Sequence, residues 1–185
     1  MKGSLVSAEI VEPYAEAFMS IAESNNLTER FGDDARSLIN LLENSPELRE
    51  FLNNPVLKPN DQKAVIRQVL GEEAHPYLVN LLMLLVDKRR IMFLEGICKR
   101  YLDLLRQKNN IVLAEVTSAK ELTEEQRQAV SERVKGMTNA QSVELKTQVD
   151  PALLGGVIVR VGSQVLDASL QGQLRRIGMR LATTA

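Results

Sequence analysis

The spacing of apolar residues changes once along the chain, and the change divides it into two parts. Up to about residue 109, apolar positions recur every three to four residues, which is the period of an amphipathic helix. Asparagine, proline and glycine interrupt this pattern at several points, as they do between helices. We expect six helices: one that ends near Ser24 and has Pro13 in its first turn, then 28–43, 46–53, 59–70, 75–88 and 91–108.

Beyond residue 110 the apolar period falls to two, which is typical of strands. Residues 112–116 and 143–149 alternate apolar with polar side chains, and 157–161 follows a turn at Gly155-Gly156. A capping-box motif, Thr123 to Gln126, predicts a helix between the first two strands. Ser169 is expected to cap a last helix whose apolar residues face inward: Leu170, Leu174, Ile177 and Leu181.

These patterns predict a mainly α protein with two domains. Residues 1–108 form a six-helix bundle, because the joints between the predicted helices are short. Residues 109–185 form a small α/β (α+β) domain, in which a few strands and helices alternate. The natural junction is the polar stretch Lys108-Asn109-Asn110.

Two of the predicted helices are more apolar than packing in a small bundle requires. Such a helix needs an apolar stripe somewhat over about 100° wide, yet residues 78–86 are apolar nearly all round, and 11–22 leave only a narrow polar strip. Two arrangements account for this excess. In the first, the helices lie at the centre of the bundle and the other helices cover them on all sides. In the second, they pack together and leave an apolar groove for an amphipathic partner helix. Both remain open, and the groove is favoured because two such helices are hard to bury in one small bundle.

A lysine at the end of one stripe distinguishes the two apolar faces of the helix at 75–88. One stripe ends at Lys88, and a buried unpaired ammonium is costly, so we expect this stripe to face outward. The residues predicted to line the groove are Tyr14, Ala17, Ile21, Tyr77, Leu81 and Leu84. The opposite stripe, Leu78, Leu82 and Leu85, is predicted to be core.

Charge and composition disfavour several classes of function. The formal net charge is −1, whereas nucleic-acid binders usually carry a basic face or arm. The one basic run, Lys88-Arg89-Arg90, is interpreted as a helix end, where cations complement the helix dipole. No apolar run approaches the roughly 20 residues that span a bilayer, and the first residues lack the pattern of a signal peptide.

Candidate chemistry is sparse. With one cysteine, no intrachain disulfide can form, which favours a reducing compartment. A single His75 and a single Cys98 exclude a zinc cluster of these ligands; we interpret the first as a solvated helix end and the second as a buried thiol. The sequence contains neither a phosphate-binding loop nor a nucleophile elbow. We therefore expect no catalytic residues, no cofactor and no metal.

Three motifs, taken in order, carry a resemblance to a known family. They are Glu12-Pro13-Tyr14-Ala15-Glu16-Ala17, the segment V-E-L-K-T-Q-V-D-P-A-L-L-G-G-V-I-V-R-V-G at 143–162, and D-A-S-L-Q-G-Q-L-R-R at 167–176. In this order and spacing the chain resembles the delta subunit of F-type ATP synthases. This subunit is the bacterial and plastid relative of the mitochondrial oligomycin-sensitivity-conferring protein. The similarity covers essentially the whole chain.

The resemblance implies a non-catalytic stator subunit of the proton-translocating synthase. The helical domain would bind N-terminal helices of the alpha subunits in the groove, and the smaller domain would bind the C-terminal ends of the b-type stalk subunits. The protein would then lie on the cytoplasmic or stromal face of an energy-transducing membrane, the thylakoid included, and would reach that membrane only through partners. The alternatives are a generic helical adaptor and a helical RNA-binding factor, which the balanced charge disfavours.

Overall fold

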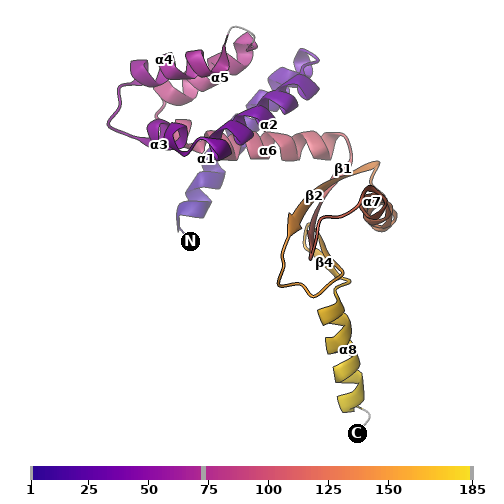
Figure 1. The fold of residues 1–185 in the computed structure, drawn as a ribbon. Helices are drawn as coiled ribbons and strands as arrows, with labels where there is room; N and C mark the ends of the chain where they lie inside the picture. The colour runs from indigo at the N-terminus through magenta and orange to yellow at the C-terminus, as the bar shows by residue number, and fades with distance from the viewer. Residues whose placement is uncertain (1, 72–73, 184–185) are drawn as a thin grey trace. The chain divides into compact units, whose positions relative to one another are not determined.

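The computed structural model describes residues 2–71 and 74–183, and the chain divides into two compact units between Leu105 and Arg106. The described residues are mainly helical, with one small mixed sheet in the second unit (Figure 1). The predicted fold class is therefore confirmed. Each unit is described by itself below.

Helices make up the first unit. They are α1 (Lys2–Ser24), α2 (Thr28–Asn44), α3 (Pro46–Asn53), α4 (Pro59–Leu70), α5 (Pro76–Asp87), the 3-10 helix η1 (Ile91–Phe93) and α6 (Leu94–Lys108), whose last turn belongs to the second unit. One expectation was wrong: α1 begins at Lys2, so Pro13 lies inside it and not in its first turn. A proline inside a helix removes one backbone hydrogen bond. The apolar surface that α1 buries after Pro13, at Ala15, Phe18, Met19 and Ala22, offsets this cost.

Aromatic rings organise the core of the helical unit. The rings of Phe18 and Phe31 stack with their centroids 4.6 Å apart, and Tyr101 lies 5.0 Å from Phe18. The Tyr101 hydroxyl donates a hydrogen bond to the carbonyl oxygen of Thr28 over 3.0 Å, so its one polar group is satisfied. Cys98 is buried beside this cluster, and burial raises the pKa of its thiol to about 12. The prediction of a buried thiol is confirmed, and a raised pKa makes such a thiol less reactive.

The second unit is built on a four-stranded sheet. Its elements are β1 (Ile111–Ser118), α7 (Glu124–Thr138), β2 (Ser142–Val149), β3 (Val157–Val161), β4 (Gln164–Asp167) and α8 (Leu170–Thr183). The strand order is β2-β1-β3-β4; β1 and β2 are parallel and are joined through α7, and the other pairs are antiparallel. The predicted capping box begins α7, because the Thr123 hydroxyl and the Gln126 side chain each accept the other's backbone N–H.

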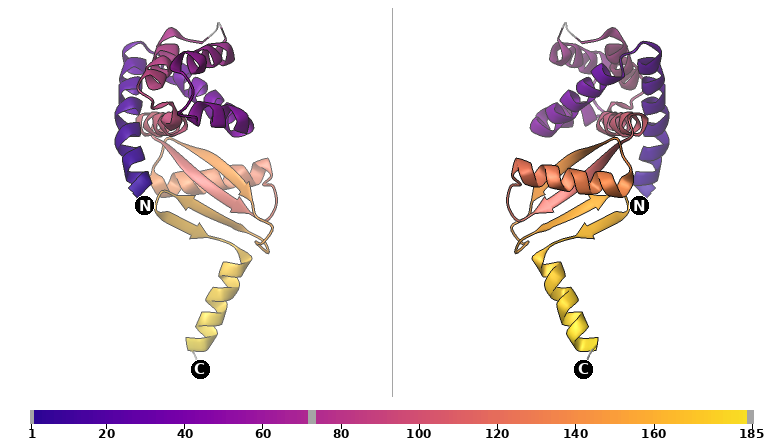
Figure 2. Two further views of the ribbon diagram at one scale, coloured as in Figure 1. Left: turned by 90° about the vertical axis from the view of Figure 1, so that its left-hand side faces the viewer. Right: turned by 90° about the vertical axis from the view of Figure 1, so that its right-hand side faces the viewer.

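The core of the second unit lies between α7 and one face of the sheet, as Figure 2 shows. Its most buried residues are Ala114, Val116, Val134 and Val159. By contrast, α8 projects away from the sheet (Figures 1 and 2). Leu170 and Leu174, which we expected to face inward, are 49% and 62% exposed. The side chains of Ile177 and Leu181 lie outside the described residues. Helical spacing identifies an apolar face, but it does not say whether the same chain covers that face.

We propose that the two units are separately folding domains. The segment between them contains exposed Lys108 and Asn110, and such connections are the preferred sites of proteolysis. Limited trypsin digestion should therefore cleave first after Lys108 and leave a helical fragment that keeps its circular dichroism and melts cooperatively. Early cleavage within 10–100, with 111–170 left intact, would contradict this assignment.

Candidate partner-binding groove

Residues of α1 and α5 line an open hollow of about 570 Å³ on the helical unit. All six predicted groove residues lie on its wall: Tyr14, Ala17, Ile21, Tyr77, Leu81 and Leu84. Pro13, Phe18, Asn80 and Arg90 complete the lining. The structure thus brings the predicted residues together in one concave surface; that this surface binds a partner stays a prediction.

The two apolar faces of α5 differ sharply in exposure. Leu84 is 44% exposed and Tyr77 is 40% exposed, whereas Leu82 is 1% exposed. Leu78 and Leu85 are also buried, at 3% and 0%. The prediction that this second stripe is core is confirmed. Half-exposed leucine and tyrosine side chains gathered in one hollow are typical of a surface that another chain covers.

The floor and one end of the hollow are held in place by aromatic contacts. Phe18 lies under the hollow and is fixed by its stack on Phe31. At the beginning of α5, His75 accepts a hydrogen bond from the backbone N–H of Tyr77 through Nδ1, over 3.3 Å. The His75 ring also meets the ring of Phe31 edge-on at 5.3 Å. His75 is therefore a partly buried helix cap that positions Tyr77, and not simply the solvated helix end we expected.

The other end of the hollow is basic, which sequence reasoning missed. Arg90 donates a hydrogen bond from Nη1 to the Tyr14 hydroxyl over 2.9 Å, and its guanidinium carbon lies 5.6 Å from the centre of the Tyr14 ring. Its neighbour Arg89, at φ 56°, instead donates to the carbonyl oxygens of Pro55 and Leu57. The basic run was the available signal, but only the turn after α5 decides which arginine reaches the groove.

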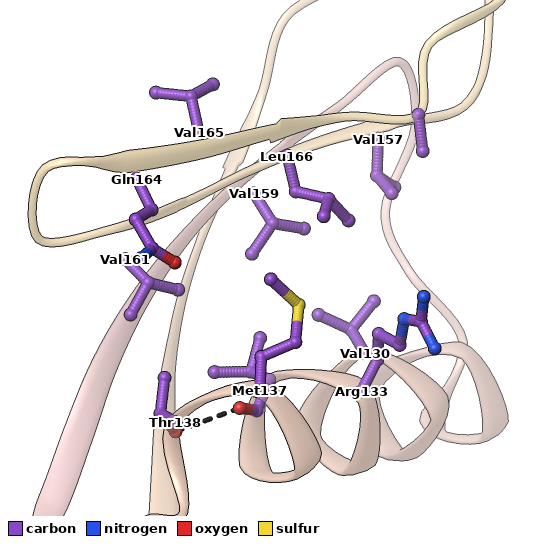
Figure 3. A pocket seen from close by; sticks show the side chains of 12 residues that line it. Val130, Arg133, Met137, Thr138, Val157, Val159, Val161, Gln164, Val165 and Leu166 are labelled. Carbon is purple, nitrogen blue, oxygen red and sulfur yellow. Dashed lines mark hydrogen bonds between the residues drawn. The ribbon is translucent and has the colours of Figure 1, made fainter.

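The second unit contains another apolar hollow, of about 580 Å³, between α7 and the strands β3 and β4. In Figure 3, Val130 and Met137 of α7 lie across from Val159 and Leu166 of the strands. Met137 is 47% exposed. The alternating strand pattern predicts one apolar face of the sheet, but it does not predict how much of that face α7 covers. This hollow therefore has no signal in the sequence pattern.

Neither hollow is built for chemistry. Within the part of the chain that the structure describes, no three His, Cys, Asp or Glu side chains are grouped so that they could hold a metal ion. No described helix combines the length and the apolar character needed to cross a membrane. What both surfaces can do is bury apolar side chains of another chain.

Comparison with known proteins decides the family. A family model described as "ATP synthase delta (OSCP) subunit" matches residues 10–181. The chain belongs to this family. The delta/OSCP subunit is a structural subunit of ATP synthase and is not catalytic by itself, in agreement with the absence of catalytic motifs from the sequence.

Curated members of the delta/OSCP family align with the chain over nearly its whole length. ATP synthase subunit delta of Gloeothece citriformis is 61% identical over 98% of both chains. The subunit of Synechocystis sp. is 59% identical over 99% of both. A cryo-EM structure of the Toxoplasma gondii mitochondrial ATP synthase hexamer contains a chain with the same fold, at a TM-score of 0.72 and 22% identity. That match covers 93% of this chain and 97% of the other.

The two faces of α5 should respond differently to substitution. Leu82→Ala removes a fully buried side chain and should lower the free energy of unfolding by about 2–5 kcal/mol, the usual cost of a core cavity. Leu84→Asp changes a half-exposed side chain and should cost less than about 1 kcal/mol. Denaturant unfolding of both variants measures the difference. A larger loss for Leu84→Asp than for Leu82→Ala would mean that the faces are reversed.

Proposed function

We propose that this delta/OSCP family member is a stator protein that ties the catalytic head of an F-type ATP synthase to its peripheral stalk. N-terminal helices of the alpha subunits dock in the groove of α1 and α5. The second unit holds the C-terminal ends of the b-type stalk subunits. The link keeps the head from turning with the central rotor, so that rotation is coupled to ATP synthesis.

The observation that carries the first attachment is the concave, half-exposed apolar lining of the groove. From Tyr14 to Ile21 the wall extends over seven residue-to-residue steps of α1, which at a rise of 1.5 Å per step is about 10 Å, or two helical turns. A partner helix with apolar residues at positions i, i+3 or i+4, and i+7 matches this length. The basic end at Arg90 favours a partner helix with a carboxylate near that end.

Two separate attachment surfaces suit a stator better than one. Each unit offers an apolar hollow of its own. When both ends of a link are bound, loss of either contact is followed by rapid rebinding, because the partner stays at high effective concentration. This physical advantage supports a mechanical tether. The two curated relatives named above, of Gloeothece citriformis and Synechocystis sp., are cyanobacterial. We therefore propose the thylakoid membrane, reached through partners on its cytoplasmic face.

Docking in the groove can be tested with the isolated protein and a synthetic peptide, without the rest of the synthase. A synthetic alpha-subunit N-terminal peptide should bind the wild-type protein, and Leu84→Asp should abolish that binding, because the new carboxylate would be desolvated at an apolar anchor. Val56→Asp is the matched control, since Val56 is 87% exposed and lies outside the groove. Isothermal titration measures both. Unchanged affinity of Leu84→Asp would place the docking site elsewhere.

The coupling role can be tested by reconstitution. Head and membrane sectors prepared without this subunit should sustain little ATP synthesis driven by a proton gradient, and adding the wild-type protein should restore it. Leu84→Asp, which cannot dock, should fail to restore synthesis, whereas Val56→Asp should succeed. The isolated protein should show no ATP hydrolysis. Full synthesis without the subunit would contradict the proposed function.

A further inference from the structure

The hollow of the second unit lies between two layers, the helix α7 and the strands β3 and β4. One face of α7 lines it with residues spaced i, i+3, i+4 and i+7: Val130, Arg133, Val134 and Met137. Alternate residues of β3 line the opposite side: Val157, Val159 and Val161. In Figure 3, Val130 and Met137 point across the hollow toward Val159 and Leu166. We call this hollow the α7 slot.

The α7 slot is buried at its floor and accessible at its rim. Val134 and Val159 are each 3% exposed and belong to the core of the unit. Met137, at the rim, is half exposed. The volume of about 580 Å³ lies within the range of small-molecule sites, roughly 300–1,000 Å³. A small apolar molecule could therefore enter from water and be covered on two sides.

One charged side chain, Arg133, lines the α7 slot. The lining contains no acidic residue. The hydroxyl of Thr138 donates to the carbonyl oxygen of Val134 over 2.9 Å, so its proton is already used within α7. Arg133 is exposed, and no other residue that the structure describes forms a hydrogen bond or an ion pair with its guanidinium. An unpaired guanidinium beside an apolar wall favours an anionic group, and a carboxylate matches its planar fork of donors.

The polar groups and the apolar wall are arranged along one direction. From Val157 to Val161 the wall extends over four residue-to-residue steps of β3, which is about 13 Å at the rise of a strand. Figure 3 shows Arg133 on the side of Val157. Gln164 is paired with Val161 at the other end of this wall. A long, narrow molecule with its charge at one end matches this arrangement.

We propose that the α7 slot binds a free fatty acid or a similar single-chain carboxylate. The carboxylate accepts hydrogen bonds from Arg133, and the acyl chain lies along Val159 and Leu166. The site does not depend on the stator function, because it is built within the second unit and is tested without any partner chain.

The groove of the helical unit also combines apolar walls with an arginine, so it is the alternative site for such a ligand. The two arginines differ in their partners. Arg90 already donates to the Tyr14 hydroxyl and lies against the Tyr14 ring. A carboxylate in the groove would have to compete with these contacts, whereas Arg133 has none to lose among the described residues. The α7 slot is therefore the better carboxylate site.

The acyl chain of a membrane phospholipid is the other source of this chemistry. Such a chain is already buried in the bilayer, so moving it into the α7 slot gains little from the hydrophobic effect. A free fatty acid is transferred from water, and the full effect contributes to its binding. We therefore assign the slot to the free carboxylate.

Isothermal titration of the full-length protein with octanoate, decanoate and decylammonium, each below its micelle-forming concentration, tests the ligand class. We expect one decanoate per chain. Each buried methylene should tighten binding about fourfold, so decanoate should bind roughly fifteenfold more tightly than octanoate. Decylammonium has the same apolar chain but is repelled by Arg133, so it should bind at least about tenfold more weakly than decanoate.

The role of Arg133 is tested by reversing its charge. Arg133→Glu should invert the preference, so that decylammonium binds more tightly than decanoate. Arg160→Glu is the matched control, because Arg160 is an exposed arginine of β3 that alternates with the lining valines and so lies on the other face of the sheet. This control should retain the preference of the wild type for decanoate.

The position of the acyl chain is tested at the rim. Met137→Asp places a charge where the chain would be buried and should weaken decanoate binding at least about tenfold. Leu154→Asp is the control, since Leu154 is 75% exposed and lies outside the α7 slot. Both substitutions change accessible side chains, so the melting temperature should be retained. Should Met137→Asp unfold the unit, the comparison of Arg133→Glu with Arg160→Glu decides the point.

Four results would overturn the proposal. Equal binding of decanoate and decylammonium would exclude a carboxylate site. Decanoate binding that is lost in Leu84→Asp and kept in Met137→Asp would place the ligand in the groove of the helical unit. Sedimentation with anionic phospholipid vesicles that Met137→Asp prevents, without decanoate binding, would assign the slot to a membrane. A solution dimer that Met137→Asp dissociates, again without decanoate binding, would assign it to a second copy of the chain. None of these results bears on the stator function, because no stalk or head subunit is present.

Discussion

One apolar face of α5 is buried in the core and the opposite face is half exposed to water. The stability of the helical unit depends on the buried face, and its candidate groove depends on the exposed one. Leu78, Leu82 and Leu85 are withdrawn from water into the core, while Tyr77 and Leu84 remain half exposed on the opposite side. Burial of the first set stabilises the bundle through the hydrophobic effect. The second set contributes little to folding because it is still in contact with water. That remaining apolar surface is what a docked helix can bury.

Rigidity of the groove follows from the same packing. Phe18 is at once part of the hollow and part of the stacked pair with Phe31, so the groove floor moves only if the core moves. His75 ties Tyr77 to this aromatic cluster, and Arg90 ties the opposite end to Tyr14. A surface already organised before binding loses less conformational entropy when a partner docks. For a protein that transmits force, this also limits slack at the contact.

The last helix of the second unit, α8, projects away from the sheet, so packing in a core does not hold it in place. At the start of α8, hydrogen bonds between Asp167 and Ser169 and the close approach that Gly156 and Gly172 allow take the place of core packing. Here glycine matters for the volume it leaves free as much as for its backbone freedom. The family motif around Asp167 to Gly172 thereby acquires a physical explanation: its hydrogen bonds fix where α8 begins.

Hydrophobic period, capping motifs and turn residues were enough to predict the helices apart from the start of α1, the strands β1 to β3, the mainly α fold and the buried face of α5, because these depend on local geometry and on one-sided burial. The lysine at the end of one stripe was enough to choose which face of α5 is exposed to water. Three features depended on tertiary structure: which arginine of the run meets Tyr14, how much of the sheet α7 leaves open, and that α8 is exposed. Each of these features is set by contacts between segments that are distant in the chain. A local pattern identifies an apolar face, but it does not determine whether that face is buried by the same chain or by another.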